Sequence, residues 1–397
     1  MLINSLPQVT MPPAVIWTGG PSWPGLFGCL RSLGSRGVPV FVAGPARELE
    51  LLQRSRFCRG IIDTGSYDIV SSWQVLSNWC KKSKRSQKPY LCILADSILW
   101  NIESVWEELG NHFCIGHSKC YQSLRDILDK WEMISRVEQL GIRIPRSTLL
   151  RSPANLELVE AFKLPVIVKP ARPWPRCDFK AAVFSEWDRL RSFLVENKQC
   201  STLLAQEYVP GSDDQIYCYL FLHNHGARTS YEWTGRKIIQ FPTGQGIMAL
   251  GETFVHEDLS RAGRMITQGI GYEGLGGIEF KAYDGQYYFI EMSPRLEGFH
   301  GLGAKAGVDL AWLSYCLETG YPAPDMSQKS RRCFYLDETA LDKHTVKHLL
   351  PKSGKLLGAA LTGRLHTVIF SIDDRSPFQG FAMRKVRTAF CSVASSV

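Results

Sequence analysis

Apolar residues in the first hundred positions gather into short runs separated by amphipathic or turn-forming segments. Three runs, AVIWTGG (14–20), VPVFVAG (38–44) and YLCILADS (90–97), are apolar or β-branched, and each ends at glycine, aspartate or serine. Between the first two, LFGCLRSLGSRG (26–37) repeats apolar residues at helical spacing before a glycine stop. Strands and helices joined by short glycine turns predict a parallel α/β unit.

The first of these runs leads into a glycine-rich loop, TGGPSWPG (18–25). Ligands of parallel sheets bind at the carboxyl ends of the strands, so these glycines either approach a ligand closely or only make the turn. The loop lacks the GxGxxG spacing, which disfavours a dinucleotide site.

The middle of the chain predicts a helical segment followed by strands that carry lysines. The helical pattern runs through SLRDILDKWEMISRVEQL (123–140) and should end at Gly141. LPVIVKP (164–170) then predicts a short strand with Lys169 near its end, and a turn-rich loop leads to Lys180 at the start of another β-like run. Further strands are expected within 201–223, on both sides of a Pro-Gly turn, and in HTVIFSIDD (366–374), among basic helical pieces.

The segment IEFKAYDGQYYFIEMSPR (278–295) predicts a β-hairpin with two inward carboxylates. Asp284-Gly285 between alternating runs is a strong hairpin signal, and Glu279 and Glu291 lie at nearly equal distances from that turn. The two side chains should therefore face each other within about one residue of register. Facing carboxylates repel unless a cation lies between them, so the pair predicts an Mg²⁺ site; the alternative is two solvent-facing acids on an edge hairpin.

Basic residues near the hairpin change the balance between these two interpretations. Lys169 and Lys180 bracket one loop, and Arg295 follows Glu291 by four residues. Lysine binds phosphate as a point charge, so lysines beside an expected Mg²⁺ site indicate a polyphosphate ligand.

Several motifs in one order give the sequence a family resemblance. The glutamate of FIEMSPR (289–295) lies twelve residues after a first acid, Glu279. Four further matches precede this motif, DK (129–130), PVIVKP (165–170), AQEYVPG (205–211) and EWTGRK (232–237), and AGVDL (306–310) follows it. From about residue 14 to about residue 320 the chain thus resembles the ATP-grasp superfamily, and within it the carboxylate–amine ligases, such as D-aspartate ligase-like and carbamoyl-phosphate-synthase-like enzymes.

The resemblance implies a mixed α/β and α+β fold. An N-terminal parallel α/β (pre-ATP-grasp) domain is expected over 1–120. An ATP-grasp domain with two α+β subdomains that clamp ATP should follow over 121–325, with a mobile lid at about 150–210. The C-terminal segment 326–397 should pack on the ATP-grasp core.

The resemblance also implies roles for individual residues. Those expected to bind ATP are Lys130, Lys169, Lys180, Gln206, Glu207, Tyr208, Val209 and Asp213 or Asp214. Those expected to bind magnesium, as two Mg²⁺ ions, are Glu279, Glu291 and Ser293. Those expected to act in catalysis are Arg295, Lys180, Arg236 and Lys237. Arg295 would stabilise charge on the transferred phosphoryl group or on an acyl phosphate.

The sequence departs from the family pattern at three places. Ser293 stands where the family has asparagine, and Gln215 where it often has an acid for the ribose, which is why Asp213 and Asp214 are considered. The glycine-rich phosphate loop is replaced by ARPWPRCD (171–178), in which Arg172 and Arg176 could supply positive charge.

Composition adds only broad limits. The 397 residues, 45% hydrophobic and 21% charged, predict a globular protein of two or three domains, and the net charge of +8 is compatible with anionic ligands. Twelve cysteines without a CxxC pair indicate reduced thiols and not a disulfide framework. The absence of a signal-like N-terminus and of long apolar windows predicts a cytoplasmic protein without membrane or nucleic-acid partners.

The sequence therefore predicts an ATP-dependent carbon–nitrogen ligase that forms ADP. It would phosphorylate a small-molecule carboxylate and join it to an amine, with a homodimer as an open alternative. The alternatives are activation of an enol-type oxygen, a non-catalytic nucleotide-binding protein, and a dinucleotide-dependent oxidoreductase. GLGAKAG (301–307), His300 and the pair His344/His348 are expected to be packing or surface features, and Tyr231, Trp233 and Tyr272 core residues.

Overall fold

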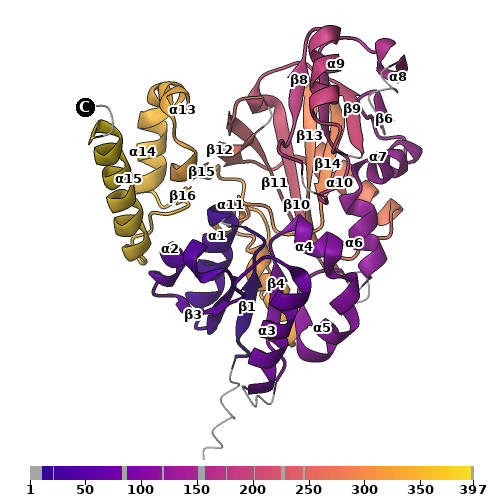
Figure 1. Cartoon of the computed structure of the whole chain (residues 1–397). Coiled ribbons are helices and arrows are strands. Elements are labelled where there is room, and N and C mark those ends of the chain that lie inside the picture. The colour runs from indigo at the N-terminus through magenta and orange to yellow at the C-terminus, as the bar shows by residue number, and fades with distance from the viewer. Residues whose placement is uncertain are drawn as a thin grey trace, which may run out of the picture.

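The protein is described here by a computed structural model that covers residues 11–20, 22–82, 87–118, 120–150, 157–175, 177–200, 202–224, 229–244 and 246–394. Figure 1 shows the N-terminal strands at the bottom, a small sheet at the upper right and a large sheet between them. The last three helices lie on the left, where α15 runs beside α2.

The N-terminal part forms the expected parallel α/β unit. Its five strands lie in the order β3-β2-β1-β4-β5 and all pair in parallel. They are β1 (Ala14–Trp17), β2 (Val40–Gly44), β3 (Cys58–Asp63), β4 (Tyr90–Ile93) and β5 (Cys114–Ile115). The helices are α1 (Trp23–Gly34), α2 (Glu50–Gln53), α3 (Ile69–Lys82), α4 (Asp96–Asn101) and α5 (Trp106–His112). The strand order reverses between β1 and β4, which is the place where such sheets bind ligands.

The helical pattern in the middle of the chain is two helices and not one. These are α6 (Tyr121–Leu128) and α7 (Lys130–Gln139). Asp129 interrupts the pattern because its side chain accepts the backbone N–H groups of Trp131 and Glu132 as the N-cap of α7.

A four-stranded antiparallel sheet with its own core corresponds to the expected lid region. Its order is β6-β9-β7-β8, formed by β6 (Ser147–Leu150), β7 (Val166–Pro170), β8 (Ala182–Phe184) and β9 (Leu203–Glu207). Helices α8 (Glu157–Glu160) and α9 (Trp187–Glu196) accompany it. Val166, Val168 and Ala205 of the sheet pack with Leu190 and Leu194 of α9. This sheet and its helix therefore form a separate hydrophobic cluster.

The large sheet has seven strands in the order β14-β13-β10-β11-β12-β15-β16. They are β10 (Ile216–Asn224), β11 (Thr229–Phe241), β12 (Ile247–Thr253), β13 (Gly274–Tyr283), β14 (Gln286–Ser293), β15 (Phe334–Leu336) and β16 (Leu365–Thr367). The helices beside it are α10 (Glu257–Gly269), α11 (Gly301–Ala306) and α12 (Leu310–Thr319). One face packs Tyr219 and Phe221 against α10, and the other packs Leu220 and Leu222 against α11 and α12.

The C-terminal segment extends the large sheet and reaches back to the N-terminal unit. It supplies β15 and β16 and the helices α13 (Lys343–Leu349), α14 (Ser353–Leu361) and α15 (Ser376–Ala394). Within the strand candidate 366–374 only the first two residues belong to β16. Asp374 is buried instead, where it accepts hydrogen bonds from Arg31 and Ser55.

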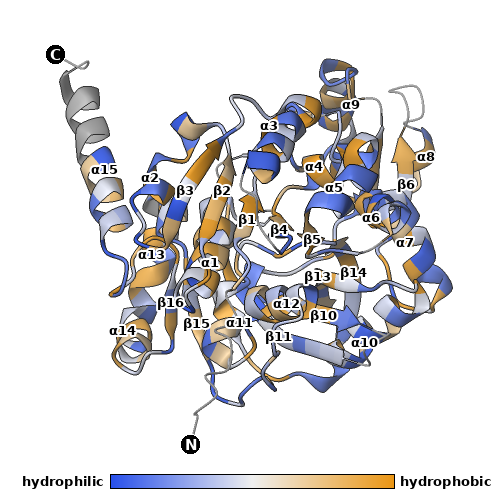
Figure 2. Ribbon diagram, turned by 90° about the horizontal axis from the view of Figure 1, so that it is seen from below, coloured by the Kyte–Doolittle hydropathy of each residue, from blue (hydrophilic) through white to orange (hydrophobic). Residues whose placement is uncertain are grey.

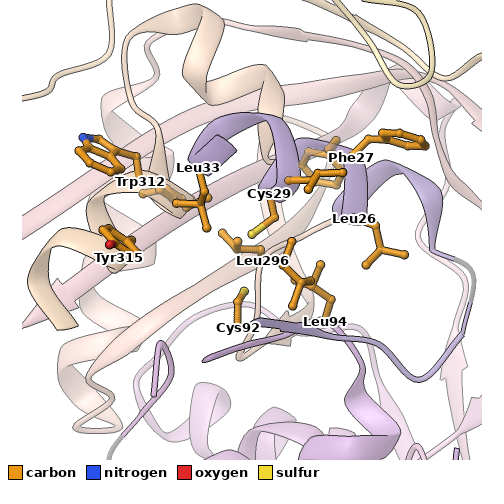
Figure 3. Packing of buried hydrophobic residues seen from close by; sticks show 14 of the residues in the cluster. Leu26, Phe27, Cys29, Leu33, Cys92, Leu94, Leu296, Trp312 and Tyr315 are labelled. Atoms are coloured by element: carbon orange, nitrogen blue, oxygen red, sulfur yellow. The ribbon is translucent and has the colours of Figure 1, made fainter. Parts of the chain in front are cut away.

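The N-terminal unit and the large-sheet side of the chain share one hydrophobic cluster. Figure 3 shows Leu296 between side chains of α1, such as Cys29, and side chains of the β4 segment, such as Leu94. Trp312 and Tyr315 of α12 complete the cluster. The segment after β14 is therefore anchored in the core of the N-terminal unit.

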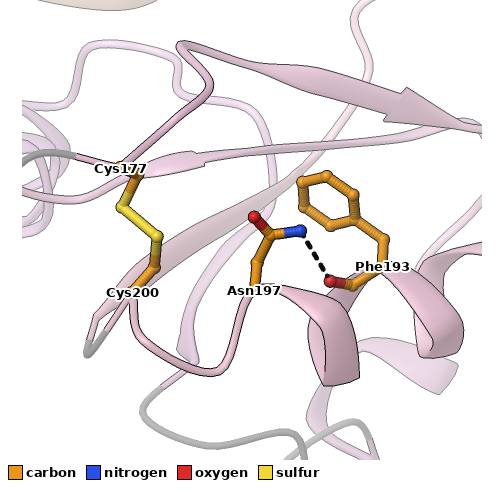
Figure 4. Close-up of a disulfide and its surroundings, with 4 residues drawn as sticks. All are labelled: Cys177, Phe193, Asn197 and Cys200. Carbon is orange, nitrogen blue, oxygen red and sulfur yellow. Dashed lines mark hydrogen bonds between the residues drawn. A yellow bond between two sulfur atoms is a disulfide. The ribbon is translucent and has the colours of Figure 1, made fainter.

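One cysteine expectation is wrong. Cys177 and Cys200 form a disulfide that links the loop after β7 to the segment after α9 (Figure 4). Residues 23 positions apart come together because β7 and β9 are sheet neighbours, which a search for CxxC spacing could not reveal.

The hydropathy of the residues follows this layered arrangement. In Figure 2 the strands β1, β2 and β3 are largely hydrophobic, whereas helices such as α3 and α10 carry much hydrophilic surface. Among the helices that the structure describes, none combines the length and the apolarity needed to cross a membrane.

Candidate active site

The expected hairpin is present and brings its two glutamates together. Asp284 and Gly285 turn the chain with positive φ angles of 49° and 67°. Glu279 of β13 pairs with Glu291 of β14, which confirms the predicted facing. A bulge at Ile290 shifts the register between this pair and the next one, and it explains why the two acids are not at equal distances from the turn.

Glu279 is buried and paired with a lysine. The residue is 9% exposed, and Lys237 Nζ donates to Glu279 Oε2 at 2.9 Å. Burial raises the pKa of Glu279 to about 7; Glu291 and Glu297 add to this effect and Lys237 opposes it. The Lys237 pKa is raised above its ordinary value because Glu279 outweighs the effect of burial. Glu279 and Glu291 therefore belong to a charge cluster that includes Lys237, and they are not two solvent-facing acids.

A second lysine, Lys169 of β7, approaches the glutamate pair from the small sheet. It is 6% exposed, and Nζ donates to the carbonyl oxygen of Ile290, the bulge residue, at 3.4 Å. Burial lowers the pKa of Lys169 to about 8, against the attraction of Glu291. Burial also opposes ionisation of Glu291, but Lys169, followed by Lys130, outweighs it and lowers the Glu291 pKa. The two sheets thus meet through opposite charges.

Lys130 and Lys180 complete the lysine group around the hairpin. Lys130 is the first residue of α7, and its backbone N–H donates to Ala171 at the end of β7 at 2.9 Å. Lys180 is exposed. The charges of both lysines act on Asp96, a residue of the N-terminal unit, so side chains from three parts of the chain converge here.

Arg236 does not join this group, although it precedes Lys237. Successive residues of a strand point to opposite faces, and Arg236 pairs with Glu252 at 2.8 Å while Lys237 reaches Glu279. Arg332 also contacts Glu252. The catalytic roles expected for both residues stay predictions; of the two, Lys237 contacts the glutamate pair and Arg236 does not.

Arg295 is held by a carboxylate that the sequence analysis did not assign. Its Nε and Nη2 donate to the two carboxylate oxygens of Asp96 at 2.6 and 2.9 Å, and Nη1 lies 3.4 Å from Glu297. Burial lowers the Arg295 pKa, but Asp96 and Glu297 raise it by more, so the pKa lies above its ordinary value. Arg295 is thus a fixed cation beside the glutamate pair. Asp96 follows β4 at the carboxyl end, which was its only sequence signal.

The oxygen donors present fit a divalent cation of the magnesium type. Glu291 and Ser293 are two residues apart on β14, and Ser293 pairs with Gly277 just as Glu291 pairs with Glu279. All three side chains therefore lie on one face. Within the described ranges no three acidic, histidine or cysteine side chains form a complete metal site. Mg²⁺ commonly binds one or two carboxylates and takes its remaining ligands from phosphate and water.

The strand expected to hold the base is β9, with the residues that follow it. Gln206 is 2% exposed, and its amide donates to Ser147. Glu207 accepts the backbone N–H of Lys163 at 2.9 Å. Tyr208 and Val209 follow the strand, and both are half-buried. The side chains of Gln206 and Glu207 are engaged locally, and β9 pairs with β6 on one side and β7 on the other, so a ligand here would meet mainly the residues that follow the strand.

Near the expected ribose position, the two aspartates differ in their partners. Asp213 accepts hydrogen bonds from the backbone of Gln240 and Gly244 at 2.8 Å each, so it holds the end of β11. Asp214 accepts only from Ser212 among the hydrogen bonds described for it. Gln215 Oε1 is buried without a partner in the described structure. Asp214 and Gln215 are therefore better placed than Asp213 to contact a ribose.

The remaining sequence candidates are mostly structural. His300 Nε2 donates to the carbonyl oxygen of Gly25, and a Cβ atom at Gly301 or Gly303 would overlap His366 or Trp233, so GLGAKAG is tightly packed. Trp233 and Tyr272 are buried core residues. Arg172 pairs with Asp129, the N-cap of α7, at 2.7 Å. Arg176 and the side chain of His344 lie outside the described residues.

Comparison with known proteins places these features in a sequence context. The model of the carbamoyl-phosphate synthase L chain ATP-binding domain matches residues 252–325. The carbamoyl phosphate synthase large chain of Methanosphaerula palustris is 24% identical over 221 residues, which are 53% of this chain and 19% of that protein. A second curated relative, the acetyl-CoA carboxylase of Dictyostelium discoideum, is matched over 5% of its length. The chain thus spans a fifth or less of these relatives.

Solved structures resemble the chain over most of its length. An N5-carboxyaminoimidazole ribonucleotide synthetase in complex with ADP has a TM-score of 0.65 at 14% identity, covering 89% of this chain and 88% of that one. An L-amino acid ligase from Bacillus licheniformis has a TM-score of 0.58 at 12% identity, covering 80% and 76%. The fold is shared although the sequences have diverged widely.

Proposed function

We propose that the chain is an ATP-dependent ligase of the ATP-grasp superfamily that activates a small-molecule carboxylate and joins it to an amine. The observation that carries the proposal is the facing pair of Glu279 and Glu291, surrounded by lysines from two sheets. Such a cluster is costly in a protein that has no cation and no anion to bind there.

The proposed roles follow from the positions of the side chains. Glu279, Glu291 and Ser293 would hold Mg²⁺, which would neutralise charge on the phosphates. Lys130 and Lys169 would bind the phosphate oxygens, and exposed Lys180 would cover them from its loop. The end of β9 with the residues that follow it, and residues 213–215, would hold the nucleoside. The neighbour that is solved with ADP supports the choice of nucleotide.

The proposed reaction needs positioning and charge neutralisation but no nucleophilic side chain. A carboxylate oxygen of the substrate attacks the γ-phosphorus of ATP, and ADP leaves. The amine then attacks the acyl carbon, and phosphate leaves as the amide forms. Arg295 would stabilise the negative charge that develops on the transferred group. The substrate would lie between Arg295 and the carboxyl ends of β1 and β4, where Gly20 leaves open space.

The experiment that tests this function measures ADP release with Mg-ATP across a panel of carboxylates, bicarbonate included, and amines. Hydroxylamine serves as a general acceptor because it traps an acyl phosphate as a hydroxamate. We expect ADP release that depends on one class of carboxylate and equals the amount of hydroxamate or amide formed. Tight binding of NAD without any binding of ATP would contradict the proposal.

The affinity for Mg-ATP should depend on pH in both directions. It should rise as the pH passes about 7, because a proton on Glu279 competes with the metal ion. It should fall above about 8, because neutral Lys169 no longer attracts phosphate. Calorimetric titrations at pH 6, 7.5 and 9 measure the effect; an affinity that increases steadily up to pH 9 would contradict the role of Lys169.

A further inference from the structure

Three consecutive residues after the metal-binding strand are each held by the N-terminal unit. Pro294, Arg295 and Leu296 follow Ser293 directly, and each makes a different kind of contact. The contacts lie at the end of β4 and just after β5, so one part of the N-terminal sheet contributes most of them.

The first contact is a histidine bridge. His117 is 2% exposed; its Nε2 accepts the backbone N–H of Ile93 at 2.8 Å, and Nδ1 lies 3.1 Å from the carbonyl oxygen of Pro294. Because Nε2 accepts, the proton must be on Nδ1, which donates to Pro294. The neutral imidazole therefore links β4 to the turn that precedes Arg295.

The second contact is the ion pair between Asp96 and Arg295. The two carboxylate oxygens meet Nε and Nη2 side by side, which fixes the plane of the guanidinium as well as its position. Asp96 is the first residue of α4, so its backbone is fixed by that helix. The two residues are 199 positions apart.

The third contact is apolar. Leu296 is 2% exposed and lies among side chains of α1 and β4, as Figure 3 shows. A buried leucine cannot leave such a site without loss of packing. The backbone on both sides of Arg295 is therefore fixed.

We propose that Asp96 and His117 are positioning residues through which the N-terminal unit sets the orientation of Arg295 in the reaction. The inference rests on the proposed function for its kinetic consequence, but the contact itself can be tested in the free protein. Asp96 does not touch the reacting group in this account; it acts by holding the guanidinium, as supporting carboxylates hold other functional side chains.

The kinetic test is a double-mutant cycle with Asp96→Asn and Arg295→Lys, using the acid and amine from the ADP-release panel. Asp96→Asn keeps the shape but removes the charge, and we expect kcat to fall by up to about 10²-fold with an unchanged Kd for Mg-ATP. In the Arg295→Lys background the same change should cost little more, because the group that Asp96 orients is already lost. Additive losses in the cycle would overturn the proposal.

A control and a second measurement separate this proposal from the function itself. Arg36→Gln removes another ion pair between α1 and the α12 region, Arg36–Asp309 at 2.8 Å, and should leave kcat unchanged. In the free protein, the ¹⁵Nε–H signal of Arg295, identified by its loss in Arg295→Lys, should shift strongly in Asp96→Asn and His117→Gln. If the wild type releases no ADP with any carboxylate, the proposed function fails, and this signal alone decides: a shift supports the positioning contact, and an unchanged signal overturns it.

Discussion

Replacing Glu291 with Gln should lower turnover by at least about 10²-fold while the protein stays folded. The change removes one charge from the proposed Mg²⁺ site at nearly constant shape, and a metal ion that neutralises a transferring phosphoryl group contributes several kcal/mol to that step. It also leaves Lys169 beside an uncharged partner, so Mg-ATP should bind more weakly. Steady-state ADP release and thermal unfolding measure both consequences.

The hairpin itself offers a matched control for Glu291. Asp284→Asn makes the same change from carboxylate to amide at the turn, where φ is 49° and asparagine is as well tolerated as aspartate. This variant should keep wild-type turnover. Normal turnover of Glu291→Gln would remove Glu291 from the metal site.

Arg295→Lys should reduce turnover by roughly 10²–10³-fold, the scale for loss of one preorganised donor. Lysine keeps the charge but loses the planar fork that Asp96 holds at 2.6 and 2.9 Å. Affinity for ATP should change little, because Lys130, Lys169 and the residues at the end of β9 remain. The measurement compares kcat with the Kd for Mg-ATP in the variant and the wild type.

A matched variant at a second arginine, Arg264, tests whether the effect of Arg295→Lys comes from lost catalysis or merely from a lost ion pair. Arg264 pairs with Glu232 and Glu257 on the other face of the large sheet. Arg264→Lys should have almost no effect on turnover, since partly exposed pairs contribute only ~0–1 kcal/mol to stability. Equal losses in both variants would show that Arg295 has no special role.

The hairpin could be predicted because its signals are local. Asp284-Gly285 sets the turn and the alternation of side chains sets the faces, so the pairing of Glu279 with Glu291 followed from spacing. The bulge at Ile290 has no comparable signal. It depends on tertiary packing, where Lys169 uses the carbonyl oxygen of that residue.

Other features of the site have different physical origins. Catalytic roles were expected for both Arg236 and Lys237, and strand alternation places their side chains on opposite faces of the sheet. The contact between Asp96 and Arg295 joins the N-terminal unit to the segment after β14, and no local pattern in either segment encodes it. The Cys177–Cys200 disulfide likewise depends on which strands are neighbours. Local pairing could be predicted from the sequence, whereas contacts between distant segments required the fold.

The measurement that tests the central claim most directly follows oxygen from the substrate into phosphate. The carboxylate identified by the ADP-release panel is labelled with ¹⁸O in its carboxyl group and incubated with the protein, Mg-ATP and the amine. If the carboxylate is activated as an acyl phosphate, each phosphate released carries one ¹⁸O atom, and mass spectrometry detects it. Unlabelled phosphate, with all of the ¹⁸O retained in the acid or the product, would contradict the account.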